Sequence, residues 1–303
     1  MGALLLFAVH GCSSQRHHRA PFVHMEGSSV NLRKGQIIDT KNASIISFDE
    51  LIEKLGAHDL VFIGEIHDNP EHHLIQVQVL QALRARHGRL AVATEFFEKP
   101  RQPFIDRYLD GDIEEREFLD LVGWDKTWSF DYSLYRPLIL ETKYGGNTIY
   151  AINVPRDIVR KVARSGLESL TPEEKGHIAE RIDLENRKHR EYVRKAYKLH
   201  KHRDLDTFDF FYQAQCVWED SMAENIASHM EGTGERIVVF SGNGHIIYKF
   251  GIPERTFKRT GTPFATLILQ PATDKAATDP ESADFIWFTG HCAGRSHFMR
   301  NSR

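Results

Sequence analysis

The chain has 303 residues, of which 41% are hydrophobic and 27% are charged. These proportions are typical of a soluble globular protein and exclude a disordered or membrane-spanning chain. The formal net charge of −3 gives no reason to expect nucleic acid as a partner. Seventeen histidines are a high count, which leaves metal or cofactor chemistry open.

The start of the chain resembles a processing signal. The apolar run Ala3–Val9 is too short to cross a bilayer but suits the apolar part of a signal peptide. A glycine directly before Cys12 resembles the bacterial lipobox, although His10 stands where a small residue is usual. We therefore expect residues 1–12 to be a signal peptide, Cys12 to be lipidated and residues 13–34 to be a tether. The alternative is a buried N-terminal strand.

Helices and strands alternate through the body of the chain. Ser47 and Glu50 form a capping box at the start of one helix, and Asn69-Pro70 begins the next. Short apolar runs between helices predict an α/β fold with a mostly parallel central sheet flanked by helices. We place the last strand at the edge of the sheet. The predicted helices span residues 48–55, 70–87 and 104–121, and the predicted strands span residues 60–63, 90–94, 148–152, 236–240, 264–269 and 284–289.

A helical insertion, at about residues 157–232, separates the third and fourth core strands. A capping box at Thr171 predicts a helix that reaches about His202, and a second helix follows at residues 207–230. Nine Lys and Arg residues lie between positions 181 and 203, where they either form a solvated face or attract anionic groups. Gln215 lies in the apolar stripe of the second helix, either within the core or facing a site.

Polar residues follow four of the predicted strands. Glu65 and His67 follow the first, Glu95 the second, a loop ending at Arg156 the third, and a Gly-x-x-His motif ending at His245 the fourth. Because the carboxyl ends of parallel strands meet at one edge of a sheet, we expect a shared site there. Two histidines and a carboxylate can hold a divalent ion, or they can act as a metal-free acid and base. The guanidinium of Arg156 could bind a carboxylate or phosphate.

Three cysteines, at positions 12, 216 and 292, are too few and too widely spaced for a disulfide framework or a cysteine-based zinc site. Cys216 and Cys292 could pair in an oxidising compartment. We favour free, buried thiols.

The paired motifs Gly64-Glu65-Ile66-His67 and Gly242-Asn243-Gly244-His245, with Glu95 between them, resemble those of a superfamily. That superfamily unites the ChaN haem-binding lipoproteins, the TIKI and TraB proteins and the erythromycin esterases. The chain is most similar to ChaN-like proteins over residues 35–290, which leaves residues 291–303 as a C-terminal tail. The likeness extends to residues 135–137, 153–156, 215–223 and 284–289.

This resemblance implies an iron-regulated haem-binding lipoprotein of the bacterial envelope, expected at the outer membrane, with haem groups stacked between two protomers of a homodimer. In the family a tyrosine takes the haem iron and a histidine of the partner contacts haem. The Lys/Arg-rich helix would suit haem propionates. The candidate haem-binding residues are Tyr132, Tyr135, Arg156, Tyr192, Tyr197 and Tyr212.

The other relatives imply hydrolysis. The TIKI proteins imply a metal-dependent protease, with Mn, Zn or Co held by His67, Glu95 and His245, whereas the esterases imply metal-free hydrolysis with a histidine base. In either case the catalytic residues would be those three and Glu65. We favour the haem-binding protein of iron uptake, keep the metal-dependent hydrolase as the alternative, and leave an interaction protein with a structural polar cluster as a third hypothesis.

Overall fold

The computed structural model describes residues 23–25, 31–199, 207–272 and 277–290. The predicted signal peptide with its lipidation site at Cys12, the predicted C-terminal tail and Cys292 lie outside these residues. Within the described part of the chain, no helix is long and apolar enough to cross a membrane.

The core of the molecule is one eight-stranded sheet with the order β4-β3-β11-β9-β5-β8-β6-β7. The six strands from β11 to β7 in this order pair in parallel, and only β3 and β4 pair antiparallel to their neighbours. The predicted α/β fold with a mostly parallel sheet is therefore confirmed. The strands are β3 (Ile37–Asp39), β4 (Ser44–Ile46), β5 (Leu60–Glu65), β6 (Ala91–Glu98), β7 (Thr148–Asn153), β8 (Ile237–Gly242), β9 (Phe264–Pro271) and β11 (Phe285–Thr289).

The last strand, β11, is not at the sheet edge as we predicted. It lies between β9 and β3, because the short β3–β4 hairpin ahead of the first helix adds two strands beyond it. Three more short strands form a separate small sheet: β1 (Val23–Met25), β2 (Asn31–Leu32) and β10 (Ala277–Thr278). Strands β1 and β2 lie within the range expected to be a tether, and both pair into this sheet.

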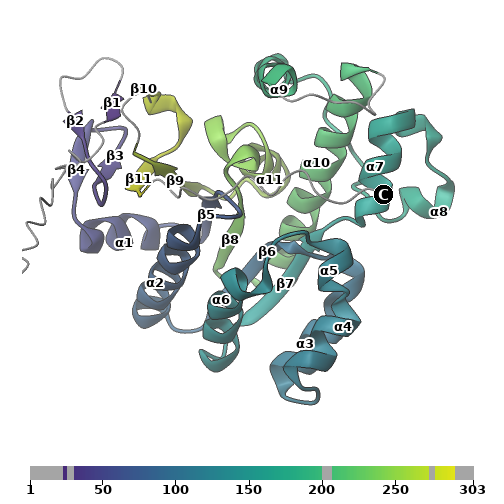
Figure 1. The fold of residues 1–303 in the computed structure, drawn as a ribbon, viewed down its shortest axis with the longest axis horizontal. Helices are drawn as coiled ribbons and strands as arrows, with labels where there is room; N and C mark the ends of the chain where they lie inside the picture. Colours follow the sequence, from purple (N-terminus) through teal and green to yellow (C-terminus); the bar gives the residue numbers. More distant parts are fainter. Residues whose placement is uncertain (1–22, 26–30, 200–206, 273–276, 291–303) are drawn as a thin grey trace, which may run out of the picture.

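Helices cover both faces of the main sheet (Figure 1). Because successive side chains of a strand point to opposite faces, Val61 and Ile63 of β5 pack into one apolar cluster while Leu60 and Phe62 pack into the other. The first cluster includes side chains of α1 (Phe48–Gly56), α2 (Pro70–His87), α3 (Gln102–Asp110), α4 (Glu115–Val122), α5 (Trp124–Thr127) and α6 (Tyr132–Tyr144). The second includes side chains of α10 (Phe208–Thr233) and α11 (Ile252–Thr260).

Two predicted helices are shorter than expected. The region 104–121 forms α3 and α4, because Gly111 has a φ of 85° and ends α3 in a left-handed cap. The helix predicted from Thr171 to His202 is instead α8 (Pro172–Lys175) and α9 (Arg187–Leu199), preceded by α7 (Arg156–Ser165). The chain between α8 and α9 stays irregular because its backbone N–H groups at residues 179 and 183 donate to side chains of α10. The described part of the chain also contains the 3-10 turns η1 (Lys99–Arg101), η2 (Leu167–Ser169), η3 (Asn243–His245), η4 (Ile247–Lys249) and η5 (Pro280–Ser282).

Candidate functional site

The central feature of the site is a group of acidic and histidine side chains at the carboxyl ends of β5, β6 and β8. We call Glu65, His67, Glu95, Glu219 and His245 the strand-edge cluster. Strand β8 lies between β5 and β6, and Glu65 is directly opposite Gly242 in the parallel ladder. Sheet topology therefore brings residues from distant parts of the sequence to one edge.

Glu65, the last residue of β5, is buried and surrounded by hydrogen-bond donors. Its carboxylate accepts from the hydroxyl of Tyr135 at 3.0 Å, from the amide of Gln76 at 2.7 Å and from Nδ1 of His67 at 2.8 Å. His73 lies 3.2 Å from the other carboxylate oxygen. Burial opposes the charge of Glu65, but the hydrogen bond from His67 and the charges of His73 and His67 outweigh it and lower its pKa.

His67 is oriented by Glu65 so that its second nitrogen faces β8. A methyl group built on Gly242 would lie 2.8 Å from Nε2 of His67, so only glycine fits at this position without displacing the ring. The rings of Trp128 and Phe130 flank the imidazole, with centroids 5.1 and 4.7 Å away. Burial lowers the pKa of His67, but the hydrogen bond to Glu65 and the charge of Glu95 outweigh it and raise the pKa overall.

A small pocket opens beside His67. It has a volume of about 380 Å³ and combines polar groups with the ring of Phe130. Its lining residues are Glu65, Ile66, His67, Asp68, Phe130, Gly242, Asn243 and Gly244.

Glu95 and His245 form a buried ion pair next to His67. Glu95 lies within β6, which runs four residues further than we predicted, and it accepts the backbone N–H of Gly242 at 2.7 Å. Nε2 of His245 is 3.5 Å from Glu95, and its Nδ1 is 3.2 Å from Glu219. Burial disfavours both charges, yet the partners prevail: the charge of His245 lowers the pKa of Glu95 to about 2, and that of Glu95 helps to raise the pKa of His245 to about 10.

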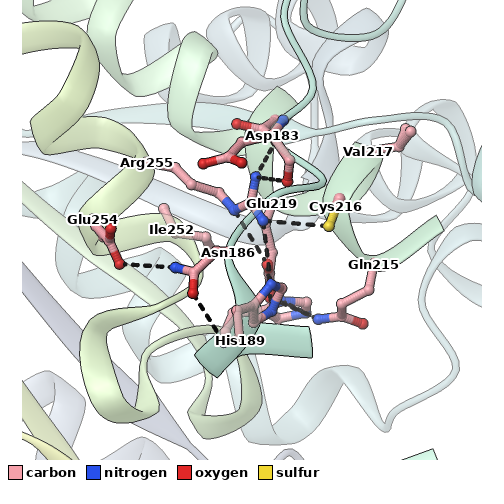
Figure 2. Close-up of polar contacts among 12 residues, drawn as sticks. Asp183, Asn186, His189, Gln215, Cys216, Val217, Glu219, Ile252, Glu254 and Arg255 are labelled. Carbon is pink, nitrogen blue, oxygen red and sulfur yellow. Dashed lines mark hydrogen bonds and ion pairs between the residues drawn. The ribbon is translucent and has the colours of Figure 1, made fainter. Parts of the chain in front are cut away.

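Glu219 continues the cluster into the protein interior (Figure 2). One of its oxygens accepts from the amide of Gln215 at 2.7 Å and faces His245, and the other lies 3.1 Å from Nε2 of His189 and 3.4 Å from Nε of Arg255. Arg255 also pairs with Asp220. The charges of His189 and Arg255 and the hydrogen bonds from His189 and His245 overcome the burial and lower the pKa of Glu219. We had not predicted roles for Glu219, His189 or Arg255; Gln215 is the exception, because its polarity within an apolar stripe had suggested a site.

The third predicted strand end lies beside the cluster rather than in it. The side chain of Asn153 donates to the backbone oxygen of Glu95 at 2.6 Å and accepts from the indole of Trp218 at 2.5 Å. The Trp218 ring in turn packs against His245, with centroids 4.9 Å apart. Arg156 donates to the hydroxyl of Ser129 at 3.0 Å and forms no ion pair with the other residues that the structure describes.

The expected metal ligands do not form a metal site in this geometry. Within the described residues, no group of three or more His, Cys, Asp or Glu side chains is arranged to hold a metal ion. His67, Glu95 and His245 do lie together, but both nitrogens of His245 face carboxylates, and Nδ1 of His67 is used by Glu65. The arrangement favours charge pairing and proton transfer between imidazole and carboxylate.

Tyr135 and Tyr212 are unsuited to bind haem. Both are fully buried: the hydroxyl of Tyr135 donates to Glu65, and that of Tyr212 contacts the backbone oxygen of Asn186 at 3.3 Å. His72, near the start of α2, is also buried, and its ring contacts the hydroxyl of Thr289 at 2.9 Å.

Two candidate tyrosines remain accessible on α9. Tyr192 and Tyr197 are half-buried, and the ring of Tyr192 meets that of Tyr248 at 5.7 Å. Burial and the nearby charge of Glu219 raise the pKa of Tyr192 to about 12. The helix also exposes a stripe of basic side chains at Arg187, Lys188, Arg194, Lys195 and Lys198.

The fold and the strand-edge cluster define an α/β protein with paired Gly-x-x-His loops at the carboxyl edge of its sheet. A family model described as "Haem-binding uptake, Tiki superfamily, ChaN" matches residues 51–256, and the chain belongs to this family. The resemblance predicted from the sequence is thereby confirmed. No curated protein matches the chain.

Among the solved structures that match this chain, the first described below shares its fold. The structure titled "Cofacial heme binding to ChaN of Campylobacter jejuni" is 20% identical, covers 83% of this chain and 95% of its own, and has a TM-score of 0.66. A mutant of the erythromycin esterase EreC in its open conformation is 14% identical over 78% of this chain and 76% of its own, with a TM-score of 0.48. The type III effector HopBA1 is 14% identical over 80% and 92%, with a TM-score of 0.46.

Proposed function

We propose that the protein binds haem for bacterial haem and iron uptake, with Tyr192 on α9 as the iron ligand. The single observation that carries this choice is the state of its hydroxyl. Tyr192 is half-buried, and its hydroxyl has no hydrogen-bond partner among the residues that the structure describes, whereas the hydroxyls of Tyr135 and Tyr212 are enclosed in the core. Membership of the haem-binding family supports the ligand.

The surroundings of Tyr192 suit haem. Phenolate oxygens bind ferric haem iron in other proteins. Tyr192 would hold the haem through its phenolate oxygen, and the haem would supply the iron. Tyr248 and Phe250 stack at 5.5 Å on the loop facing α9 and offer an apolar contact for a macrocycle. The basic stripe of α9 provides donors for the two propionates. Because the pKa of Tyr192 is about 12, ligation must displace its proton, and binding should tighten as the pH rises.

Haemin titration of purified protein tests this proposal. We expect the absorption spectrum of tyrosinate-ligated ferric haem, and we expect the Tyr192→Phe variant to lose it. Tyr144→Phe is the matched control, because Tyr144 is 79% exposed on α6 and far from α9 in the fold. Loss of the spectrum in Tyr197→Phe instead would transfer the role to the second tyrosine of α9. An unchanged spectrum in both α9 variants would refute α9 as the haem site.

The location and assembly are further parts of the proposal. We infer that the mature protein is lipidated at Cys12, held at the bacterial outer membrane, and paired as a homodimer around haem; the resemblance to ChaN-like lipoproteins and the Gly-Cys motif support these points. Membrane fractionation of the full-length protein against a Cys12→Ser variant tests the anchor. Sedimentation with and without haemin tests the dimer.

A second candidate function is metal-free hydrolysis at the strand-edge cluster. The observation that favours it is the Glu65–His67 pair, in which a buried carboxylate orients an imidazole whose other nitrogen faces the 380 Å³ pocket. Such a pair can act as a general base. The engaged nitrogens of His245 favour this form over the metal-dependent one that we predicted. Turnover of a panel of activated esters, assayed with and without a chelator, tests the metal-free hydrolysis. We expect activity that survives chelation and disappears in His67→Asn. The absence of turnover of any ester would count against this function.

A further inference from the structure

Glu219 joins two parts of the protein that have separate candidate roles. It is completely buried on α10, and its two carboxylate oxygens face in different directions. One oxygen faces His245 of the strand-edge cluster at 3.2 Å, and the other faces His189 of α9 at 3.1 Å. A single carboxylate therefore bridges the sheet edge and the helix that carries the candidate haem ligand.

The contact between Glu219 and α9 is buried in the protein interior. His189 and Arg255 are 1% and 2% exposed, so neither side chain has water as an alternative partner. Nη2 of Arg255 lies 3.2 Å from Nδ1 of His189, and Nε2 of the same ring lies 3.1 Å from Glu219, so the imidazole stands between the guanidinium and the carboxylate. Figure 2 shows His189, Glu219 and Arg255 converging in this way.

The chain that follows His245 also packs against Glu219. A methyl group built on Gly251 would lie 2.9 Å from a carboxylate oxygen of Glu219, which places the loop after His245 directly against it. That loop carries Tyr248, the ring that Tyr192 meets. Tyr192 follows His189 by three residues, so the two side chains lie on neighbouring turns of one side of α9. Glu219 thus contacts α9 through His189, and it contacts both ends of the loop 246–250, through His245 and Gly251.

We propose that Glu219 is a positioning residue for haem: it docks α9 against the loop 246–250 and so assembles the surface on which Tyr192 is presented. This inference rests on the proposed haem function, and it adds a residue that does not itself touch haem. If haem binds only when α9 is docked, a variant with α9 docked one tenth of the time binds haemin about tenfold more weakly.

Hydrogen exchange measured by mass spectrometry tests the docking without haem. In Glu219→Gln we expect faster exchange in the α9 amides, residues 187–199, while β5, β6 and β8 exchange at the wild-type rate. Glu224→Gln is the matched control, because Glu224 lies on the same helix but contacts Arg259 and residue 180 rather than α9. Unchanged exchange in α9 would overturn the proposal, and so would an equal acceleration in the sheet, since that would mean a general loss of stability.

Haemin affinity supplies the second readout. We expect Glu219→Gln and His189→Gln each to weaken haemin binding by about tenfold or more, and the double variant to be no weaker than either single one, since both break the same contact. Additive losses would overturn the proposal. If Glu219→Gln does not fold, His189→Gln carries the exchange test alone, because it leaves the strand-edge cluster complete. Wild-type protein that binds no haemin would refute the proposed function, while the exchange result would still decide whether Glu219 docks α9.

Discussion

Replacing Tyr135 by phenylalanine removes one hydroxyl group and leaves the shape of the side chain unchanged. The hydroxyl is fully buried and donates to the carboxylate of Glu65 at 3.0 Å. A hydrogen bond to a charged group contributes about 1.5–3 kcal/mol, and because Glu65 is only 3% exposed, bulk water compensates little for the lost donor. We therefore expect Tyr135→Phe to lower the free energy of unfolding by about 2 kcal/mol.

The same helix offers a matched control. The hydroxyl of Tyr132 also donates to a carboxylate, that of Glu115 at 2.8 Å, but this carboxylate is 30% exposed and is held by Arg136 as well. Water and Arg136 can compensate there, so Tyr132→Phe should cost less than about 1 kcal/mol.

Urea unfolding followed by circular dichroism measures both variants, and equal denaturant slopes would establish that only stability has changed. The same samples can be titrated with haemin. Because Tyr135 is enclosed in the core, its variant should keep the wild-type haem spectrum. Equal destabilisation by the two substitutions, or a stable Tyr135→Phe variant, would refute the reasoning that Glu65 depends on this buried donor.

Three further predictions concern charge, thiol reactivity and close packing. The pKa of Glu95 is about 2 and that of His245 is about 10, so the stabilisation from Glu95 is lost as the pH falls below 4.5 and that from His245 is lost as the pH rises above 6.5. The thermal midpoint should therefore be highest between pH 4.5 and pH 6.5. The His245→Gln variant should show a smaller decline in stability on the alkaline side. Burial raises the pKa of Cys216 to about 12, so peptide mapping after iodoacetamide at neutral pH should find it unmodified in native protein and modified after unfolding. Gly242→Ala should displace the ring of His67 and lower the free energy of unfolding in urea by about 1–3 kcal/mol. Gly244→Ala is the control and should lower it less, because nothing lies within 4 Å of the added methyl group.

Much of the sheet could be predicted from local pattern. The strands β5 and β8 are continuous apolar runs because both of their faces are covered by helices, and such runs are easy to recognise. The order of the strands is not encoded in this way. The place of β11 depends on the three-residue strand β3, whose sequence is too short to signal a strand. The irregular chain after α8 was missed because side chains of α10, distant in sequence, take its backbone donors.

The site was partly predictable for a similar reason. A general rule of parallel sheets brought His67, Glu95 and His245 to one edge without any knowledge of their contacts. Glu219 and Arg255 could not be found by that rule, because both lie within helices. A buried charge is recognisable only from its partners, and His189 is in a different helix from either of them.

Helix α10 is 26 residues long and contacts several regions of the molecule. Near its middle Glu219 meets the sheet edge, and further along the amide of Asn225 donates to the backbone of β7 at 2.8 Å. Each residue added to a helix turns everything beyond it by about 100°. A single insertion between these two positions would therefore swing one contact out of reach whichever end stayed in place. The length of this helix is therefore constrained, so natural variation in length should be confined to the loops at either end.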